Sequence, residues 1–342
     1  MLTVASDDHR RHHPRMPSID DGVEFGPVEI PERVDRILDA LRAADLGPIR
    51  PPEEFGPEPV LRVHTRAYVE FLATVHAEWC AATGRPEHAE ATPYARAVRD
   101  QPDSEPVHPI AKLGWYSHDS DPVLAGTFTA ATAAVDVALS AWRAVATGDV
   151  GTAYALCRPP GHHAAADSFG GYCYLNNAAI VAQAAVDTGA RVAILDVDFH
   201  HGNGTQQLFY DRDDVLFVSV HADPAQHYPY FLGFASERGW GAGEGYTRNF
   251  PLPAGTDWAR YGSALDAAAA VVTKYDPDLL VVSLGVDTAA EDADSFRLTG
   301  EDFTRIGAAL AALARPTVVV QEGGYDLEVI GRNVTNVLRE LG

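Results

Sequence analysis

Short apolar runs alternate with longer alanine-rich segments over most of the chain. Five of the short runs are rich in β-branched residues, which is typical of buried parallel strands: YALC (154–157), VAIL (192–195), VLFVSV (215–220), LLVVSLGV (279–286) and TVVVQ (317–321). The alanine-rich segments predict helices at about 127–146, 176–187, 258–274 and 301–314. This repeated order predicts an α/β fold in which helices cover both faces of a mostly parallel sheet.

Two local patterns support the predicted helix boundaries. Thr299 and Asp302 have the Thr-x-x-Asp spacing of a capping box, which predicts a helix start just before 301–314. Near the N-terminus, four apolar residues recur at helical spacing after Pro31 and predict an opening helix: Val34, Ile37, Leu38 and Leu41.

Two segments lack this regular pattern. The stretch 76–122 has scattered charges, little periodicity and several prolines, among them Pro86, Pro93, Pro102, Pro106 and Pro109, which predicts an irregular insertion. So long an irregular segment inside a compact domain usually serves a binding site or a subunit contact. The glycine-rich run GWGAGEG (239–245) does not lie between a predicted strand and a predicted helix, so we expect a loop rather than a phosphate-binding turn.

Composition and charge narrow the classes of protein. With 342 residues the chain is long enough for one large α/β domain or two smaller ones. Asp and Glu outnumber Lys and Arg by 48 to 26, and the net charge of −22 argues against a nucleic-acid partner. Most of these charges serve solubility, and an acidic surface also attracts cationic substrates.

Targeting signals and cysteines point to the cytoplasm. No apolar run is long enough to span a membrane, and the first 17 residues lack the apolar segment of a secretory signal. We therefore predict a cytoplasmic protein with no membrane partner. Cys80, Cys157 and Cys173 cannot all pair and show no C-x-x-C spacing, so we interpret them as structural thiols.

The main chemical signal lies at the ends of the predicted strands. The run VAIL leads directly into Asp196, Asp198, His200 and His201. Because alternate residues of a strand share a face, the first three of these side chains are expected to point the same way. The other predicted strands lead to further polar residues: His162 and His163, His221, Asp287 and Tyr325. Ligands of parallel sheets bind at the carboxyl ends of the strands, so these residues predict one site.

The residue types at this edge suit metal-assisted hydrolysis. Asp198, His200 and Asp287 make a three-ligand set with an open position for water, as catalytic zinc sites require. A metal there would acidify water and polarise a carbonyl group.

The remaining side chains suit acid–base work. One of the adjacent His162 and His163 would be the general base, while the other adjusts the local field. Asp196 is placed to hold His162, and Asn203 to orient His163. The hydroxyl of Tyr325, which follows two glycines, would stabilise an oxyanion.

These residues resemble the zinc-dependent deacetylases of the arginase/histone-deacetylase superfamily. The motifs occur in the family's order: RPPGHHA (158–164), GGYCYLNNAA (170–179), DVDFHHGNGT (196–205), LGVDT (284–288) and EGGY (322–325). The match runs from about residue 110 to the end. HADPAQHYPYFLGFASERG (221–239) and the 76–122 insertion are most similar to the bacterial acetylpolyamine amidohydrolases of that family.

The resemblance implies a fold and a set of site residues. The fold would be a single three-layer αβα domain over residues 1–342, with a mostly parallel sheet of about eight strands. One Zn²⁺ per chain would be bound by Asp198, His200 and Asp287, with His162 and His163 as the dyad and Tyr325 as the electrophilic tyrosine. Gly171, Tyr172 and Tyr228 would line a narrow acyl channel.

The same resemblance implies structural cations and an assembly. One K⁺ or Na⁺ would use Asp196, Asp198, His200, Ser219 and Val220. A second would lie near Phe209, Arg212, Val215 and Tyr246. The 76–122 insertion would form a homodimer, or a dimer of dimers, in which the partner narrows the channel.

Three positions bear on the substrate. Asn203 replaces the Asp that many histone deacetylases have after HHG, and no acid stands near Ile110, where polyamine enzymes can place a glutamate. Seven residues after Asp287, Asp294 replaces an apolar residue at the channel mouth. A carboxylate there would pair with an ammonium group of the substrate. Asp119 and Asp121 are further candidates for that role.

The sequence therefore predicts a zinc-dependent amidohydrolase that removes acetyl groups from small cationic amines, above all acetylpolyamines, releasing acetate and free amine. Alternatives are a protein lysine deacetylase and a deacetylase of another small metabolite. A binuclear manganese hydrolase and an inactive metal- or acyl-binding module are the remaining hypotheses.

Overall fold

The centre of the molecule is an eight-stranded sheet in which every neighbouring pair of strands is parallel. The structure is a computed structural model that describes residues 1–20, 23–93, 105–293 and 296–342. In spatial order the strands are β4 (Ile49–Arg50), β1 (Leu2–Val4), β5 (Thr152–Ala155), β10 (Thr317–Gln321), β9 (Leu279–Leu284), β6 (Val192–Asp196), β7 (Val215–Ala222) and β8 (Thr247–Leu252). Two further strands, β2 (Ser18–Asp20) and β3 (Val23–Phe25), form a separate antiparallel pair.

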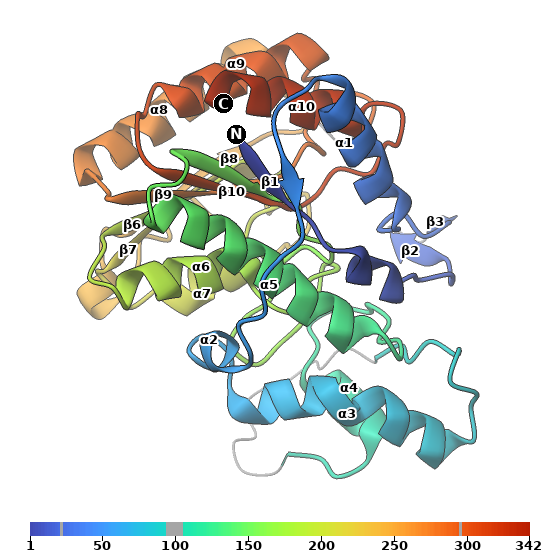
Figure 1. Cartoon of the computed structure of the whole chain (residues 1–342). Helices are drawn as coiled ribbons and strands as arrows, with labels where there is room; N and C mark the ends of the chain where they lie inside the picture. Colours follow the sequence, from blue (N-terminus) through green and yellow to red (C-terminus); the bar gives the residue numbers. More distant parts are fainter. Residues whose placement is uncertain (21–22, 94–104, 294–295) are drawn as a thin grey trace.

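Helices cover both faces of this sheet (Figure 1). One face is covered by α5 (Thr127–Ala146), α6 (Asn177–Val186) and α7 (Asn203–Phe209), and the other by α1 (Glu32–Ala43), α8 (Trp258–Tyr275), α9 (Gly300–Ala311) and α10 (Ile330–Leu341). Strand side chains alternate between the two layers: in β6, Val192 and Ile194 pack toward α6, while Ala193 and Leu195 pack toward α8. The predicted three-layer α/β fold is confirmed.

A third apolar cluster lies beside the sheet, beneath α5. It includes side chains of α3 (Arg66–Thr83) and α4 (Pro109–Trp115). Val60 of the short helix α2 (Glu58–Leu61) belongs to the same cluster. The prediction of an irregular 76–122 segment is therefore wrong in part, because α3 reaches Thr83 and α4 spans Pro109–Trp115. Buried Phe71, Leu72 and Val75 form the inner face of α3, a pattern that begins before the predicted segment. Residues 94–104 of that segment lie outside the described residues.

The predicted strands and helices match the observed ones to within a few residues. The first predicted strand lies two residues earlier, at β5, and the last predicted helix ends at Ala311. The capping box is present, with the Thr299 and Asp302 side chains each accepting a hydrogen bond from the other residue's backbone. The sequence patterns did not predict β1, β4 or β8. GWGAGEG is a loop with a 3-10 turn at Gly241–Gly243, as expected.

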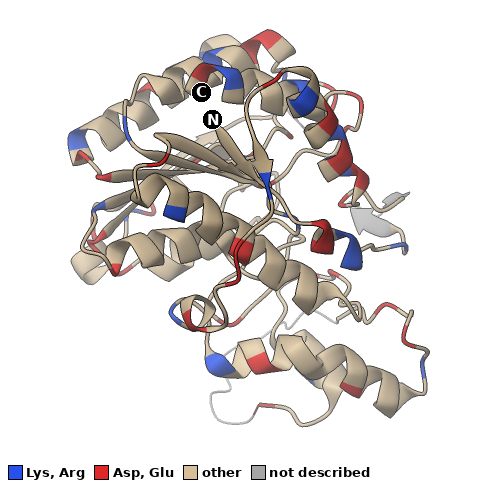
Figure 2. Cartoon of the chain, viewed as in Figure 1, with Lys and Arg blue, Asp and Glu red and all other residues tan. Residues whose placement is uncertain are grey.

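The surface carries the acidic excess. Asp and Glu occur on helices of both outer layers (Figure 2). Some are paired with arginines, for example Asp187 with Arg62 at 2.9 Å, but solvent screens such exposed pairs and they contribute little to stability. Within the described ranges, none of the helices combines the length and the apolar character needed to cross a membrane.

Candidate active site

The predicted site residues meet where the strands end. His162 and His163 follow β5, Asp198 and His200 follow β6, Asp287 follows β9, and Tyr325 follows β10. Because these strands are parallel neighbours, their carboxyl ends lie at one edge of the sheet. His221 differs, because it lies within β7. Its ring contacts the Ser219 hydroxyl at 2.7 Å and the Gly233 carbonyl at 2.8 Å, so it braces the chain instead of joining the site.

Asp198, His200 and Asp287 form a compact donor cluster. One ligand atom from each lies within 4.8 Å of the other two. Nδ1 of His200 is 3.4 Å from an Asp198 oxygen and 3.1 Å from an Asp287 oxygen. Strand alternation does not create this arrangement, because β6 ends at Asp196. A turn does: the Asp198 amide donates to the Asp196 carboxylate at 3.1 Å, and the His200 amide donates to Asp198 at 2.9 Å.

This cluster fits a zinc ion. Two carboxylates and one imidazole are three zinc-type ligands, the number that catalytic sites use. Asp198 and Asp287 are buried, and burial of adjacent carboxylates is unfavourable without a cation. Burial and the charge of Asp198 raise the pKa of Asp287, whereas His162 and His200, against the effect of burial, hold the pKa of Asp198 low. A Cβ on Gly323 would lie 2.4 Å from Asp287 Oδ2, so only glycine leaves these oxygens their space.

His162 and His163 lie side by side but have different partners. Their ring centroids are 4.0 Å apart. Nδ1 of His162 is 3.0 Å from the Asp196 carboxylate, and Nδ1 of His163 is 2.6 Å from the Asn203 side-chain oxygen. Although burial opposes it, Asp198 and Asp196 raise the pKa of His162 to about 10. Burial and the neighbouring His162 lower the pKa of His163 well below its ordinary value. Opposite shifts of this kind are typical of groups with different acid–base roles.

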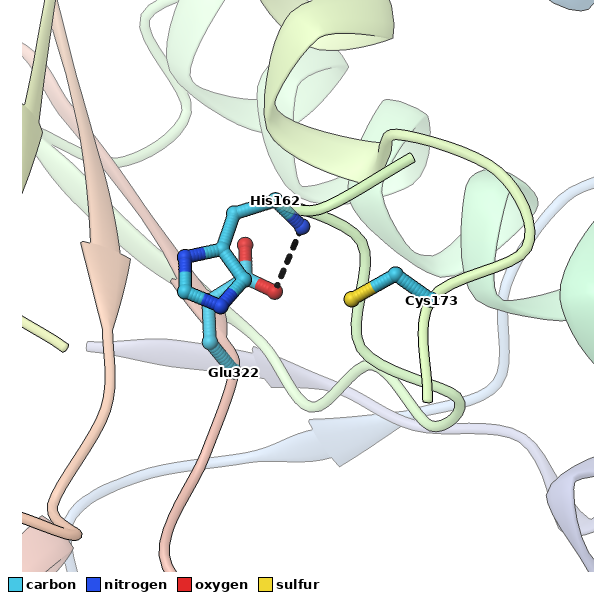
Figure 3. Close-up of side chains that lie close together, drawn as sticks. All are labelled: His162, Cys173 and Glu322. Carbon is cyan, nitrogen blue, oxygen red and sulfur yellow. Dashed lines mark hydrogen bonds between the residues drawn. The ribbon is translucent and has the colours of Figure 1, made fainter. Parts of the chain in front are cut away.

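A second cluster supports the backbone of the dyad (Figure 3). The Glu322 carboxylate accepts hydrogen bonds from the amides of Gly161 at 2.7 Å and His162 at 3.2 Å, and from the Ser283 hydroxyl at 3.1 Å. Cys173 completes a group of possible ligands with His162 and Glu322. However, burial raises the pKa of the Cys173 thiol, which keeps it protonated and a poor ligand. We interpret this group as hydrogen-bonded support, which does not favour a binuclear site.

Tyr325 stands between an arginine and a second tyrosine. The Arg33 guanidinium lies 4.7 Å from its ring centroid, and the Tyr172 ring centroid is 5.7 Å away. Burial raises the pKa of Tyr325 well above its ordinary value although Arg33 opposes the shift, so the hydroxyl keeps its proton and can donate.

Sequence reasoning missed Arg33. This buried side chain pairs with Glu29 at 2.8 Å and donates to the carbonyls of Gly324 at 2.6 Å and Glu322 at 2.7 Å. The signal was available, because Arg33 lies four residues before Ile37 and so on the apolar face of α1.

The described channel candidates surround the dyad and Tyr325. Gly171 has φ +58°, and a Cβ there would lie 2.3 Å from the His163 ring. Tyr228 stands edge-on to His163, with ring centroids 4.9 Å apart. The proposed ammonium partner Asp294 lies outside the described residues. Of the two weaker candidates, Asp119 accepts a hydrogen bond from the Gly171 amide at 3.2 Å. Burial raises the pKa of Asp121 well above its ordinary value, which disfavours its charged form.

The two candidate sets for monovalent cations lie toward opposite ends of the strands, one toward the carboxyl ends of β6 and β7 and the other at the start of β7. The first set surrounds the ends of β6 and β7, where Asp196 and Ser219 are paired in register. Asp198, His200 and Val220 belong to the same set. In the second set, Val215 begins β7, the Phe209 carbonyl accepts from the Arg212 amide at 3.1 Å, and the Tyr246 carbonyl accepts from Phe217 at 2.8 Å.

Comparisons with known proteins agree with this geometry. A family model described as histone deacetylase domain matches residues 27–341, and so begins well before residue 110, where the motif resemblance starts. Acetylpolyamine amidohydrolase 2 of Pseudomonas aeruginosa is 51% identical, over 99% of this chain and 98% of that protein. Acetylpolyamine amidohydrolase of Mycoplana ramosa is 42% identical, over 99% of each chain. The crystal structure of acetylpolyamine aminohydrolase from Burkholderia pseudomallei, 42% identical, has a TM-score of 0.93 over 100% of this chain and 98% of that one.

Proposed function

The chain belongs to the histone deacetylase domain family and is a deacetylase, and on that premise we propose that it hydrolyses the amide bond of small acetylated polyamines. The products are acetate and the free amine. The observation that carries the proposal is the cluster of Asp198, His200 and Asp287 beside the dyad. Relatives named acetylpolyamine amidohydrolases, 42–51% identical over nearly the whole chain, support the substrate class.

One zinc ion would be held by Asp198, His200 and Asp287. When bound, zinc supplies a Lewis acid that polarises the acetyl carbonyl and lowers the pKa of water. The chain supplies the rest of the chemistry. Because Asn203 accepts the proton of His163 Nδ1, the Nε2 atom of His163 carries the lone pair. Nε2 takes a proton from the attacking water and returns it to the leaving amine nitrogen.

His162 and Tyr325 assist this proton transfer in different ways. The Asp196 carboxylate orients His162 through Nδ1, so the ring keeps a fixed position beside His163. The Tyr325 hydroxyl donates a hydrogen bond to the oxygen of the acetyl group as negative charge develops on it. Removing one such donor from an enzyme costs roughly 10²–10³ in rate.

The polyamine chain is recognised by charge. An acetylated polyamine carries at least one ammonium group several bonds from the acetyl carbon. Asp119 stands next to Gly171 at the channel wall, and Asp294 is the second proposed carboxylate. The acidic surface of the chain, with a net charge of −22, attracts such cations and repels nucleic acid.

The active form is a homodimer, with K⁺ or Na⁺ at the two candidate cation sites. Large apolar side chains are exposed just after the channel residue Tyr228, with Phe231 82% exposed, and in the 76–122 segment, with Val107 90% exposed. Single exposed apolar side chains are common, but contiguous ones mark interfaces, and Tyr230, Phe231 and Phe234 form one such run in the sequence. Light scattering on the purified protein measures the assembly directly. The cytoplasmic location belongs to the same proposal.

The test compares kcat/KM of the zinc-loaded protein on acetylputrescine, acetylspermidine and an acetyl-lysine peptide. We expect the acetylpolyamines to be preferred by at least tenfold, and Asp198→Ala to abolish turnover of all three. A preference for the peptide would contradict the proposed substrate and identify a lysine deacetylase. Turnover by Asp198→Ala at the wild-type rate would contradict the proposed metal site.

A further inference from the structure

Asp292 holds the backbone of Tyr325. A single oxygen, Oδ1, accepts hydrogen bonds from the amide of Tyr325 at 3.0 Å and from the amide of Asp326 at 2.9 Å. These amides lie in the loop between β10 and α10, whereas Asp292 lies in the loop between β9 and α9. The contact therefore joins two loops that are more than thirty residues apart in sequence.

The loop that carries Asp292 makes further contacts of its own. It also carries Asp287, five residues earlier, and Asp292 closes a turn in which its amide donates to the Ala289 carbonyl at 3.1 Å. The neighbouring Glu291 pairs with Arg332 of α10 at 3.2 Å. Asp292 thus holds the segment that carries Tyr325 at a fixed distance from the loop that carries Asp287.

The hydrogen bonds from the amides of Tyr325 and Asp326 to Asp292 restrain a part of the backbone that is intrinsically flexible. Two glycines precede Tyr325, so the local backbone has unusual conformational freedom. On the other side of the loop, Arg33 binds the Gly324 carbonyl at 2.6 Å. Asp292 contacts the same segment from the Asp287 loop, and one of its side-chain oxygens accepts from both amides whether or not the carboxyl group is protonated.

We propose that Asp292 is a positioning residue for the reaction, which fixes the Tyr325 hydroxyl relative to the loop of Asp287. This inference rests on the proposed function, because it assigns Tyr325 the role of oxyanion donor. A misplacement of about 1 Å in such a group costs on the order of 10² in rate. Asp292 acts through the backbone of Tyr325 and is not assigned a catalytic role of its own.

The test is a double-mutant cycle on the zinc-loaded enzyme with acetylspermidine. Asp292→Ala is expected to lower kcat by roughly tenfold to a hundredfold, with KM changed by less than about threefold. Asp292→Asn keeps the accepting oxygen and should retain most of kcat. In a Tyr325→Phe background, Asp292→Ala should lower kcat no further, because the group that it positions is already gone. An additive loss would mean a merely structural role and would overturn the inference.

Two further variants complete the experiment. Asp278 also accepts a backbone amide, that of Arg191 at 2.8 Å, but at the opposite end of β9, so Asp278→Ala should leave kcat near wild type. Asp292→Glu keeps the charge but shifts the acceptor, and should lower kcat even if Asp292→Ala does not fold. If Asp292→Glu keeps the wild-type kcat while Tyr325→Phe is impaired, the positioning role of Asp292 is overturned and the proposed function still holds. Wild-type kcat in Tyr325→Phe contradicts the role of Tyr325 in the proposed function.

Discussion

The side-chain oxygen of Asn203 lies 2.6 Å from Nδ1 of His163, whereas Nδ1 of the adjacent His162 faces the carboxylate of Asp196 at 3.0 Å. Two neighbouring imidazoles therefore have partners of different charge. A neutral partner fixes the position of the Nδ1 proton of His163 and stabilises its protonated form less than a carboxylate does. This difference leaves His163 as the base of the pair.

Replacing this partner with a carboxylate should shift the pH profile. In Asn203→Asp, the new charge stabilises protonated His163 and raises its pKa, by roughly one unit. Because His163 acts in its neutral form, the acidic limb of kcat/KM should move to higher pH, and activity at low pH should fall. The profile of kcat/KM against pH for both proteins measures the shift. An acidic limb that stays in place would show that His163 is not the base.

A methyl group at position 171 should displace His163. Because a Cβ on Gly171 would lie 2.3 Å from the His163 ring, we expect Gly171→Ala to lower kcat/KM by about a hundredfold. Gly148 is the matched control, since it also has a positive φ, +77°, but has no atom within 4 Å of its Cβ position. Gly148→Ala should cost only stability, roughly 1–2 kcal/mol from the positive φ, and keep full activity. Equal losses in both variants would assign the effect to backbone strain.

Removing the charge of Asp119 should weaken the binding of charged substrates only. Asp119→Asn retains an oxygen that can accept from the Gly171 amide, but it cannot form an ion pair with an ammonium group. We expect KM for acetylspermidine to rise by about threefold to tenfold. A neutral N-acetyl alkylamine of similar length should show no change. A KM increase of equal size for both substrates would mean that Asp119 shapes the channel without recognising charge.

The buried Glu322 should stabilise the fold through the dyad backbone. Glu322→Ala leaves three buried donors without their acceptor, so we expect the free energy of unfolding to fall by roughly 3 kcal/mol or more, with a loss of kcat. Glu322→Gln retains an oxygen for the two amides and should preserve more of both quantities. Chemical denaturation of the three proteins measures the differences. Wild-type stability in Glu322→Ala would contradict this role.

The carboxyl group of Glu322 should also make the free energy of unfolding depend on pH. Burial raises the pKa of Glu322 from 4.5 to about 7 in the folded chain. The folded state therefore binds this proton more tightly than the unfolded state, and its stabilising contribution is lost as the pH rises from about 4.5 to 7. Glu322→Gln cannot ionise, so its unfolding free energy should fall less over that range. Parallel curves for the two proteins would exclude this contribution.

The sequence predicted the core of the sheet because its strands are buried on both faces. β6, β7, β9 and β10 are each dominated by apolar residues, and such segments stand out in any sequence. β1 and β4 contain three and two residues, which is too short for periodicity to detect. β8 contains an Arg, an Asn and a Pro, so its composition hid it. These strands form because they pair with neighbouring strands at or near the edges of the sheet. Such pairing depends on distant parts of the chain, so the local sequence says little about it.

For the site, the sequence predicted the residues that carry distinctive chemistry. His162, Asp198 and Tyr325 stand out because each follows an apolar strand in a recognisable motif. Arg33 and Asp292 were missed because their partners are distant in sequence: Arg33 contacts Gly324, and Asp292 contacts Tyr325. Asp292 contributes through contacts with backbone atoms, which leave no spacing pattern, whereas the place of Arg33 on the apolar face of α1 was a signal in the sequence that was not used. Only the folded chain brings those contacts into view.

The most direct test of the central claim is a competition assay. The zinc-loaded enzyme receives acetylspermidine and an acetyl-lysine peptide in one mixture at equal concentration, and both deacetylated products are quantified over time. The product ratio equals the ratio of the two kcat/KM values. We predict that spermidine forms at least ten times faster than the free lysine peptide. Faster formation of the peptide product would contradict the assignment of acetylpolyamines as the substrates of this deacetylase.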